Sequence, residues 1–219
     1  RAIKRMPALE TAGIRTWFCG PESFTPDDRY HLGEAPNLKG FFVACGFNSI
    51  GIQSAGGVGK VLADWIKDDH PPLDLWDVDI RRNMPFQTNS KYLHDRVTEG
   101  LGLLYAEHWP FRQYETARGV RKSALHDRLA DEGACFGETA GWERANWFAP
   151  KGVAPVYKYS YGRQNWFDYS AAEHNAVREN IGLFDLTSFA KFIVQGTDSK
   201  VTLNKICANN VDVAPGRSI

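Results

Sequence analysis

A glycine-rich turn is the part of this 219-residue sequence whose residue types and spacing best suit ligand chemistry. The turn follows a short apolar run and leads into an amphipathic stretch, so the local order is strand, turn, helix. At such a junction, backbone N–H groups and the positive end of the helix dipole can approach an electron-rich group. The candidate binding residues are Gly46, Phe47, Asn48, Ser49, Ile50, Gly51, Ile52 and Gln53.

Two phosphate-binding motifs are excluded by the residues that follow this turn. A Walker A loop needs a glycine five residues before its Gly-Lys pair and Ser or Thr after it, but Ser54 and Val61 occupy those positions. A dinucleotide fingerprint needs a third glycine three residues after Gly59, where the chain has Leu62. The turn is therefore not a standard phosphate loop.

The elements on either side of the turn are predicted from the apolar pattern. Residues 41–47 form a short apolar run with β-branched and aromatic side chains, which is typical of a buried strand. A helix capped by Ser54 is expected to follow and to end at His70-Pro71-Pro72. Its apolar face would comprise Val58, Val61, Leu62, Trp65 and Ile66. Spacing alone favours a packing role for the helix glycines, with Gly56, Gly57 and Gly59 against the sheet.

A second helix is predicted from about residue 90 to residue 107. The apolar side chains expected to share one of its faces are Val97, Leu101, Leu104 and Tyr105. Ser123 can cap a shorter helix that ends at Gly133, and residues 134–139 then form a strand.

Beyond residue 150 the pattern predicts a linker and the start of a new unit. Residues 151–164 are rich in Tyr, Gly and Pro, as expected of a linker. The sequence from Ser170 to Glu173 is a capping box, and Gly182 would end the helix that it begins. A strand over 191–195 is expected to follow, and then a helix that Asp198 caps, which runs through Ile206 and ends near Asn209-Asn210.

The bulk composition indicates a globular protein without a nucleic-acid or membrane partner. Apolar residues make up 43% and aromatic residues 13%, which is enough for a packed interior. Lys plus Arg and Asp plus Glu both number 26, so no net charge attracts the chain to a polyanion. No apolar run approaches the roughly 20 residues that span a bilayer, and no secretory signal is evident. We expect a soluble protein of the cytoplasm, or of the mitochondrial matrix in a eukaryote.

Neither the histidines nor the cysteines form a recognisable metal or catalytic site. The six histidines include no helical pair four residues apart with a third ligand nearby. His94-Asp95 and His126-Asp127 suggest parts of a triad, but adjacent helix residues point in different directions and no activated serine is evident. The four cysteines are far apart, which favours a reducing compartment. We therefore predict no metal site and name no catalytic residue.

Several stretches, in order along the chain, resemble successive parts of flavin-dependent amine oxidoreductases of the sarcosine and dimethylglycine dehydrogenase type. The first group resembles the late part of the flavin domain and comprises residues 7–10, 20–27, 32–36 and 40–49. The second resembles the central region and comprises residues 79–82, 125–129, 141–144 and 147–148. The third resembles the beginning of an aminomethyltransferase domain and comprises residues 184–192 and 209–213. The resemblance covers nearly the whole chain.

The resemblance implies an α+β chain with parts of three domains. Residues 1–75 would be the C-terminal part of an FAD-binding oxidoreductase domain, and residues 76–160 a central α/β region. Residues 161–219 would begin a folate-binding aminomethyltransferase-like domain. Because the sequence starts at Arg1 and stops early in that last unit, we expect an interior fragment that pairs with the remainder of its own chain or subunit.

The resemblance also implies the cofactors, FAD and tetrahydrofolate, and the role of the glycine turn. The turn would lie against the isoalloxazine ring, with Gln53 near its pyrimidine edge. Reduced flavin carries negative charge there, so fixed donors favour reduction. The turn at Thr25-Pro26-Asp27 would lie near the flavin as well. Cys19 sits where related amine oxidases can attach flavin, but an ordinary buried cysteine is the expected role.

The function implied is oxidative demethylation of a small N-methyl amine, with transfer of the carbon to tetrahydrofolate. The family's dinucleotide fingerprint and flavin-linking histidine have no counterpart in this chain, so the catalytic residues stay unknown. One alternative is a non-catalytic relative that resembles the regulatory subunit of pyruvate dehydrogenase phosphatase. Another is a structural or folate-binding piece whose flavin site has decayed.

Overall fold

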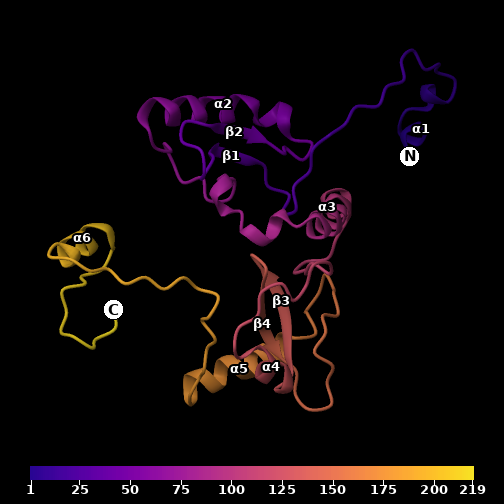
Figure 1. Ribbon diagram of the computed structural model, residues 1–219. Coiled ribbons are helices and arrows are strands. Elements are labelled where there is room, and N and C mark those ends of the chain that lie inside the picture. The colour runs from indigo at the N-terminus through magenta and orange to yellow at the C-terminus, as the bar shows by residue number, and fades with distance from the viewer.

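The computed structural model describes residues 1–219 as two small packed units joined by a central helix, with extended segments at both ends (Figure 1). The upper unit contains β1 (His31–Glu34), β2 (Phe42–Cys45) and α2 (Gly51–Asp68). Helix α3 (Ser90–Tyr105) leads to the lower unit of α4 (His126–Asp131), β3 (Ala134–Thr139), β4 (Trp142–Phe148) and α5 (Phe167–Glu179). The terminal helices are α1 (Ala2–Arg5) and α6 (Ser199–Ile206), and 3-10 turns occupy Pro7–Glu10, Ile80–Arg82 and Pro85–Thr88. Helices combined with small antiparallel sheets confirm the predicted α+β class.

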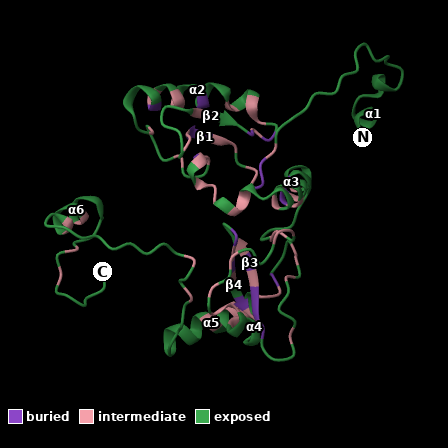
Figure 2. Cartoon of the chain, viewed as in Figure 1, coloured by how far each residue is buried: buried purple, intermediate pink, exposed green.

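The upper unit is an antiparallel strand pair covered by α2 on one face. The register pairs His31 with Cys45 and Glu34 with Phe42. Trp65 of α2 is only 3% exposed and packs on Gly33, where a Cβ would lie 2.5 Å from the indole ring. The expectation of a buried strand over 41–47 is wrong, because no residue of β2 is buried: Phe42 and Val43 are half-buried, and Ala44 and Cys45 are exposed (Figure 2).

Helix α2 differs from its prediction at its start and in the direction of its glycines. It begins at Gly51 and not at Ser54, and no side chain caps it. The buried positions are Val58 and Trp65, so these residues define the face that meets the sheet. The glycine packing role is wrong, because nothing lies within 4 Å of a Cβ at Gly56, Gly57 or Gly59. Those glycines face solvent.

Helix α3 is found close to its predicted range, but a different face is buried. The Asn89 side chain caps it by accepting from the Tyr92 N–H at 3.1 Å. The buried residues are Arg96 and Gly100. On the predicted apolar face, Leu101 is 37% exposed, Leu104 39% and Tyr105 65%. Arg96 is 3% exposed because its guanidinium pairs with Glu138 of β3 at 2.7 Å. A buried ion pair therefore holds α3 to the lower unit.

The lower unit is built on the β3–β4 hairpin. Strand β3 matches its predicted range, and β4, which was not predicted, pairs with it in antiparallel register with an irregularity between Cys135 and Phe136. Trp147 is 1% exposed and stacks on Tyr169 of α5 with ring centroids 5.6 Å apart. The segment predicted as a linker also lies against this core through Val153 and Tyr157. The predicted boundary at residues 160 and 161 thus falls within one packed cluster.

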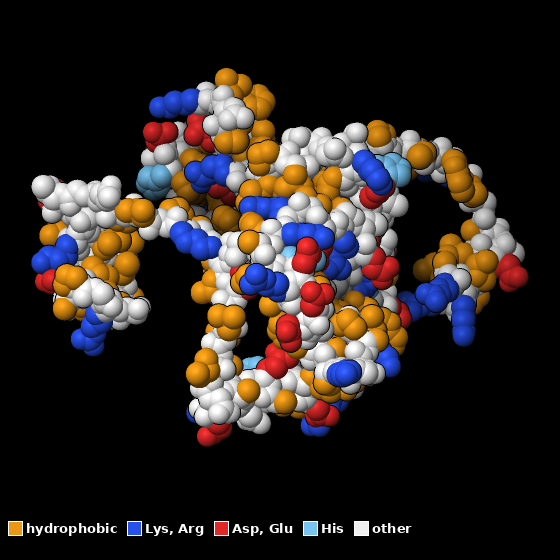
Figure 3. Space-filling view, turned by 60° about the horizontal axis from the view of Figure 1, so that its bottom comes forward, with side chains coloured by type: hydrophobic (Ala, Val, Ile, Leu, Met, Phe, Trp, Pro, Cys, Tyr) orange, Lys and Arg blue, Asp and Glu red, His pale blue; other side chains and the backbone are white.

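The remaining sequence expectations beyond residue 165 need three corrections. Helix α5 begins at Phe167, so Ser170 to Glu173 is not its capping box, and Glu173 instead accepts from the Phe148 N–H at 2.8 Å. Residues 191–195 form no strand, since no second strand lies beside them. Asp198 stands at the start of α6 without a side-chain cap, and α6 ends at Ile206. Many hydrophobic side chains of this region stay on the surface (Figure 3), including Phe192 at 85% exposure.

Gly133 is expected to tolerate alanine less well than Gly152 does. Both have a left-handed backbone, with φ of +88° and +89°, so both substitutions carry the same conformational cost of about 1–2 kcal/mol. Only at Gly133 would the new Cβ also meet backbone, 2.3 Å from the Ala149 carbonyl oxygen. Gly133→Ala should therefore lower the free energy of unfolding, measured by urea denaturation, by at least about 1 kcal/mol more than Gly152→Ala. Equal losses would show that the Gly133–Ala149 contact has no energetic role.

Candidate functional site

The predicted glycine turn joins β2 to α2 through left-handed backbone. Gly46, Asn48 and Ser49 have φ of +68°, +49° and +66°. At Gly46 the choice of glycine has a second cause, because a Cβ there would lie 2.6 Å from Thr25 Cγ2. Asparagine is one of the few other residues that adopt this conformation readily. The turn is consequently tight and packs closely on the segment that contains Thr25.

Asn48 holds this turn in place from the inside. It is 2% exposed, and its Oδ1 accepts from the Thr25 N–H at 2.8 Å. Its Nδ2 donates to Thr25 Oγ1 at 3.0 Å and to the Gly46 carbonyl at 2.8 Å. All these groups are buried, so each hydrogen bond removes a polar atom that would otherwise be unsatisfied. The structure thus brings the two predicted turns, at 25–27 and 46–53, into direct contact.

A partly buried ion pair supports the Thr25 side of this surface. Arg82 Nε and Nη2 donate to the two Asp27 carboxylate oxygens at 2.7 and 3.0 Å. The same guanidinium donates to the Arg29 carbonyl at 2.7 Å. Burial raises the pKa of Asp27, but hydrogen bonding to Arg82 and its charge outweigh burial and hold the pKa below its ordinary value. Asp27 is therefore a structural carboxylate and not a proton carrier near neutral pH.

The start of α2 presents free hydrogen-bond donors. Ile50 occupies the cap position without a side-chain hydrogen bond, and the N–H groups of Gly51, Ile52 and Gln53 have no partner in the chain. The Ile52 side chain is 99% exposed, and Gln53 is exposed too. Unpaired N–H groups at the positive end of an 18-residue helix suit an electron-rich ring edge. Free donors of this kind are what the pyrimidine edge of a reduced flavin requires.

Tyr105 is a member of this site that the sequence did not indicate. Its hydroxyl donates to Ser49 Oγ at 2.5 Å, across 56 residues of sequence. Helix α3 therefore contacts the turn directly, and Phe47 stacks on Tyr30 from the other direction, with ring centroids 5.0 Å apart. Neither contact follows a sequence period, so only the fold reveals them.

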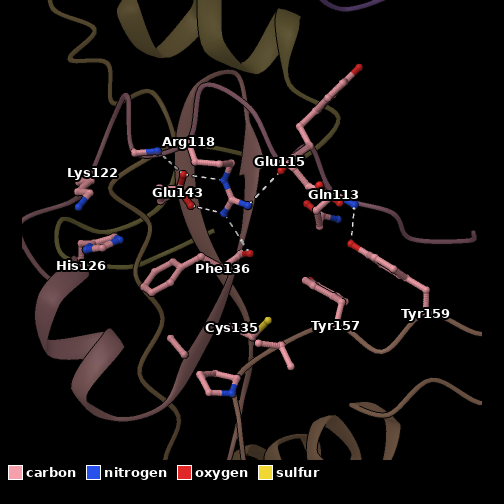
Figure 4. Close-up of a pocket in the computed structure, with 15 residues that line it drawn as sticks. Gln113, Glu115, Arg118, Lys122, His126, Cys135, Phe136, Glu143, Tyr157 and Tyr159 are labelled. Carbon is pink, nitrogen blue, oxygen red and sulfur yellow. Dashed lines mark hydrogen bonds and ion pairs between the residues drawn. The ribbon is translucent and has the colours of Figure 1, made fainter. Parts of the chain in front are cut away.

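A second candidate site is a cavity of about 720 Å³ beside β3 (Figure 4). Arg118 pairs with Glu143 and also donates to the Phe136 carbonyl at 3.2 Å, and Lys122 and His126 stand near this pair. Cys135 also lines the cavity, but burial raises the pKa of its thiol to about 11. At neutral pH the thiol is protonated and unreactive as a nucleophile.

A third candidate site is a cavity of about 680 Å³ between β4, α5 and residues 183–188. Its lining includes Trp142, Phe148 and Phe184 together with the charged Arg144 and Asp185. An apolar pocket with a few polar groups is the usual form of a small-molecule site. It belongs wholly to the C-terminal half of the chain.

Family models match the chain in three consecutive segments. Residues 1–65 match the FAD dependent oxidoreductase model, and residues 68–123 match the FAD dependent oxidoreductase central domain. Residues 125–219 match the GCVT N-terminal domain. The glycine turn and the start of α2 lie within the first of these segments.

Curated relatives align with almost the whole chain. A 4-methylaminobutanoate oxidase (formaldehyde-forming) of Paenarthrobacter nicotinovorans is 49% identical over 98% of this chain and 26% of its own length. The mitochondrial sarcosine dehydrogenase of Homo sapiens is 34% identical over 100% of this chain and 26% of its own length. The chain belongs to the sarcosine and dimethylglycine dehydrogenase family. It spans about a quarter of the length of the curated relatives it matches.

The family also has a member named for regulation. The mitochondrial pyruvate dehydrogenase phosphatase regulatory subunit of Mus musculus is 34% identical over 99% of this chain and 25% of its own length. Family membership confirms the recognised resemblance, while the role of each residue in the turn stays a prediction. No helix in the structure has the length and hydropathy needed to cross a bilayer.

The hydrogen bond between Tyr105 and Ser49 joins two of the segments that the family models match. Ser49 lies in the oxidoreductase segment and Tyr105 in the central-domain segment. The Arg96–Glu138 ion pair likewise joins the central-domain segment to the GCVT segment. Helix α3 thus contacts both of the other segments, and the Arg82–Asp27 and Arg118–Glu143 ion pairs join the same segments outside this helix.

Replacing Glu143 with glutamine is expected to lower the stability of the lower unit. It should also make that stability depend less on pH in the acid range. Burial raises the pKa of Glu143, but hydrogen bonds from Arg118 and Gly119 lower it more, so the net pKa lies below the ordinary 4.5. The carboxylate therefore stabilises the fold above pH 4.5, and this contribution is lost as the pH falls through the lowered value. At pH 7, Glu143→Gln should cost about 2 kcal/mol, less than a fully buried pair, because Arg118 is 30% exposed.

Thermal unfolding of wild type and variant between pH 3 and 7 checks this expectation. The matched control is Glu115→Gln, since the Glu115 side chain is 75% exposed and its ion pair with Arg112 is long, at 3.4 Å. The control should change stability by less than about 0.5 kcal/mol. If the unfolding temperature of Glu143→Gln changed with pH as that of wild type does, the Glu143 carboxylate would not be the source of the acid sensitivity.

Proposed function

We propose that the native protein binds FAD and oxidises the N-methyl group of a small amine of the sarcosine or dimethylglycine type. The observation that carries the proposal is the unbroken order of the oxidoreductase, central and GCVT segments in one chain. The 49% identical relative, named as a formaldehyde-forming oxidase of a methylamino acid, supports the same class of reaction. Balanced charge, with 26 basic and 26 acidic residues, supports a small-molecule substrate over a nucleic acid.

In this proposal the chain supplies one wall of the ring site. FAD, when bound, supplies the two-electron acceptor for the N-methyl C–H bond. Asn48 and Thr25 fix the turn, and the free N–H groups of Gly51, Ile52 and Gln53 stand ready to hydrogen-bond an electron-rich ring edge. Donors fixed in advance stabilise developing negative charge without reorganisation, so their effect is larger than that of mobile water.

We propose tetrahydrofolate as the acceptor of the released carbon. Oxidation of an N-methyl group gives an iminium carbon at the oxidation level of formaldehyde, which water hydrolyses or a folate nitrogen captures. The match of residues 125–219 to the GCVT N-terminal domain supports capture. The apolar cavity of about 680 Å³ within those residues has room for a fused heterocycle. The remainder of the native chain or subunit would complete both sites, in the cytoplasm or the mitochondrial matrix.

A visible spectrum and an anaerobic titration of the native full-length protein test this function. We expect the absorbance of oxidised flavin and its bleaching by sarcosine, dimethylglycine or 4-methylaminobutanoate, but not by the corresponding unmethylated amino acids. Adding tetrahydrofolate should lower the formaldehyde released per amine oxidised. Folded protein without flavin absorbance would contradict the oxidation and favour a regulatory role, whereas unchanged formaldehyde release would contradict only the folate step.

A further inference from the structure

Asp28 is a carboxylate without a partner, next to one that is fully paired. It follows Asp27 in the 25–29 turn, has φ of +56°, and makes no side-chain hydrogen bond or ion pair. Its Oδ1 is buried without any donor, whereas Arg82 neutralises Asp27. Burial and the adjacent Asp27 charge both raise the pKa of Asp28. An unpaired, half-buried charge is unfavourable for folding, so a contribution to stability does not explain the presence of Asp28.

A cavity of about 320 Å³ opens beside this carboxylate, between the turn and the C-terminal end of α3. Its size is at the lower end of the roughly 300–1,000 Å³ typical of small-molecule sites. Six residues line it: Asp28, Leu103, Leu104, His108, Arg112 and Tyr114. Gly100 lets α3 approach the turn, since a Cβ there would lie 3.0 Å from Asp28 Oδ1.

Of the carboxylate and guanidinium side chains that line the cavity, Asp28 and Arg112, only Asp28 has no ion-pair partner, and the charge of the neighbouring Arg29 offsets the rise of its pKa only in part. The Arg112 guanidinium is already paired with Glu99 at 3.0 Å and with Glu115 at 3.4 Å. Tyr114 faces the same carboxylate: burial and then the Asp28 charge raise the pKa of its phenol to about 12. Tyr114 therefore stays a neutral phenol, and its hydroxyl has no hydrogen-bond partner in the chain.

The lining selects among possible ligands. An anion would meet the unpaired Asp28 carboxylate, and a hard divalent cation needs several oxygen ligands, which one carboxylate and one phenol do not supply. An organic ammonium ion needs a single counter-charge and an apolar surface for its carbon groups. Leu103 and Leu104 provide that surface. We propose that this pocket binds a small organic ammonium ion, with its nitrogen against Asp28 and its alkyl groups against the two leucines.

Calorimetric titration of the full chain with tetramethylammonium chloride tests the site without any requirement for flavin. We expect saturable binding that sodium chloride at equal ionic strength and tert-butyl alcohol do not reproduce. Asp28→Asn should weaken the affinity at least tenfold while the protein unfolds at the same temperature or higher, because asparagine adopts left-handed backbone readily. Asp77→Asn is the matched control, since Asp77 is exposed and unpaired. The Asp77→Asn protein should bind tetramethylammonium with the wild-type affinity.

A second variant guards against indirect effects of Asp28→Asn. Leu104→Lys places a tethered ammonium group beside Asp28 on a side chain that is 39% exposed, so it should abolish tetramethylammonium binding and raise the unfolding temperature. Absence of saturable binding to wild type, or equal affinity in wild type and Asp28→Asn, would overturn the site. Undiminished binding to Leu104→Lys would overturn it as well.

Discussion

Replacing Trp147 with alanine is expected to lower the free energy of unfolding by about 3–5 kcal/mol. The side chain is 1% exposed and forms the centre of the lower unit, with Cys135 and Ala149 beside it and Tyr169 stacked on it. So few residues of this chain are buried, 19 of 219, that no neighbouring core can take over the contacts. Urea denaturation followed by near-ultraviolet circular dichroism measures the loss.

Trp17→Ala is the matched control for this substitution. Trp17 is 82% exposed in the extended segment before the upper unit, so its removal changes composition equally without creating a cavity. Its effect should stay within about 0.5 kcal/mol. If both variants lose the same stability, or if neither does, Trp147 is not the centre of the lower core.

Asn48→Ala is expected to have the second largest effect, and this effect should reach the proposed flavin site. The change leaves the Thr25 N–H and the Gly46 carbonyl buried without partners, each at about 1–3 kcal/mol. Alanine also adopts the left-handed backbone at this position less readily than asparagine. We expect a loss of about 3 kcal/mol in unfolding free energy, and a lower reduction potential of the flavin in the native protein, because the donors that favour reduction are no longer fixed.

Asn37→Ala controls for loss of an asparagine, because Asn37 is exposed in the loop between β1 and β2. Redox titration of the bound flavin measures its reduction potential, and urea denaturation measures stability. A destabilised Asn48→Ala protein whose flavin keeps the wild-type reduction potential would place the turn away from the flavin. A fully stable variant would contradict the hydrogen-bond network itself.

The sequence predicted elements well where local signals and tertiary packing agree. Strand β3 was located because Gly133 ends the preceding helix and the strand follows it directly. Strand β4 was missed because its Glu143 is a charged residue at a buried position. That position is acceptable only because Arg118, distant in sequence, pairs with it. No period in the strand itself could reveal this.

The errors at helix ends and in the extended region have a similar cause. Glu173 has the residue type and spacing of a capping box, yet it bonds to the Phe148 N–H of the neighbouring strand. Residues 191–195 have strand propensity, but a strand also needs a partner. At the site, the position of the turn was predictable from glycines, whereas the anchoring of Asn48 by Thr25 depends on a contact across 23 residues.

The solvent-facing glycines of α2 have a consequence for how the molecule opens. Each glycine inside a helix weakens it by about 0.5–1 kcal/mol relative to alanine, and Gly56, Gly57 and Gly59 lie together in the N-terminal half. The C-terminal half is instead anchored by Trp65. Amide hydrogens in the first half should therefore exchange with solvent through local unfolding that leaves the second half intact. A ligand that orders the helix start would slow that exchange, so exchange rates offer a direct report of occupancy.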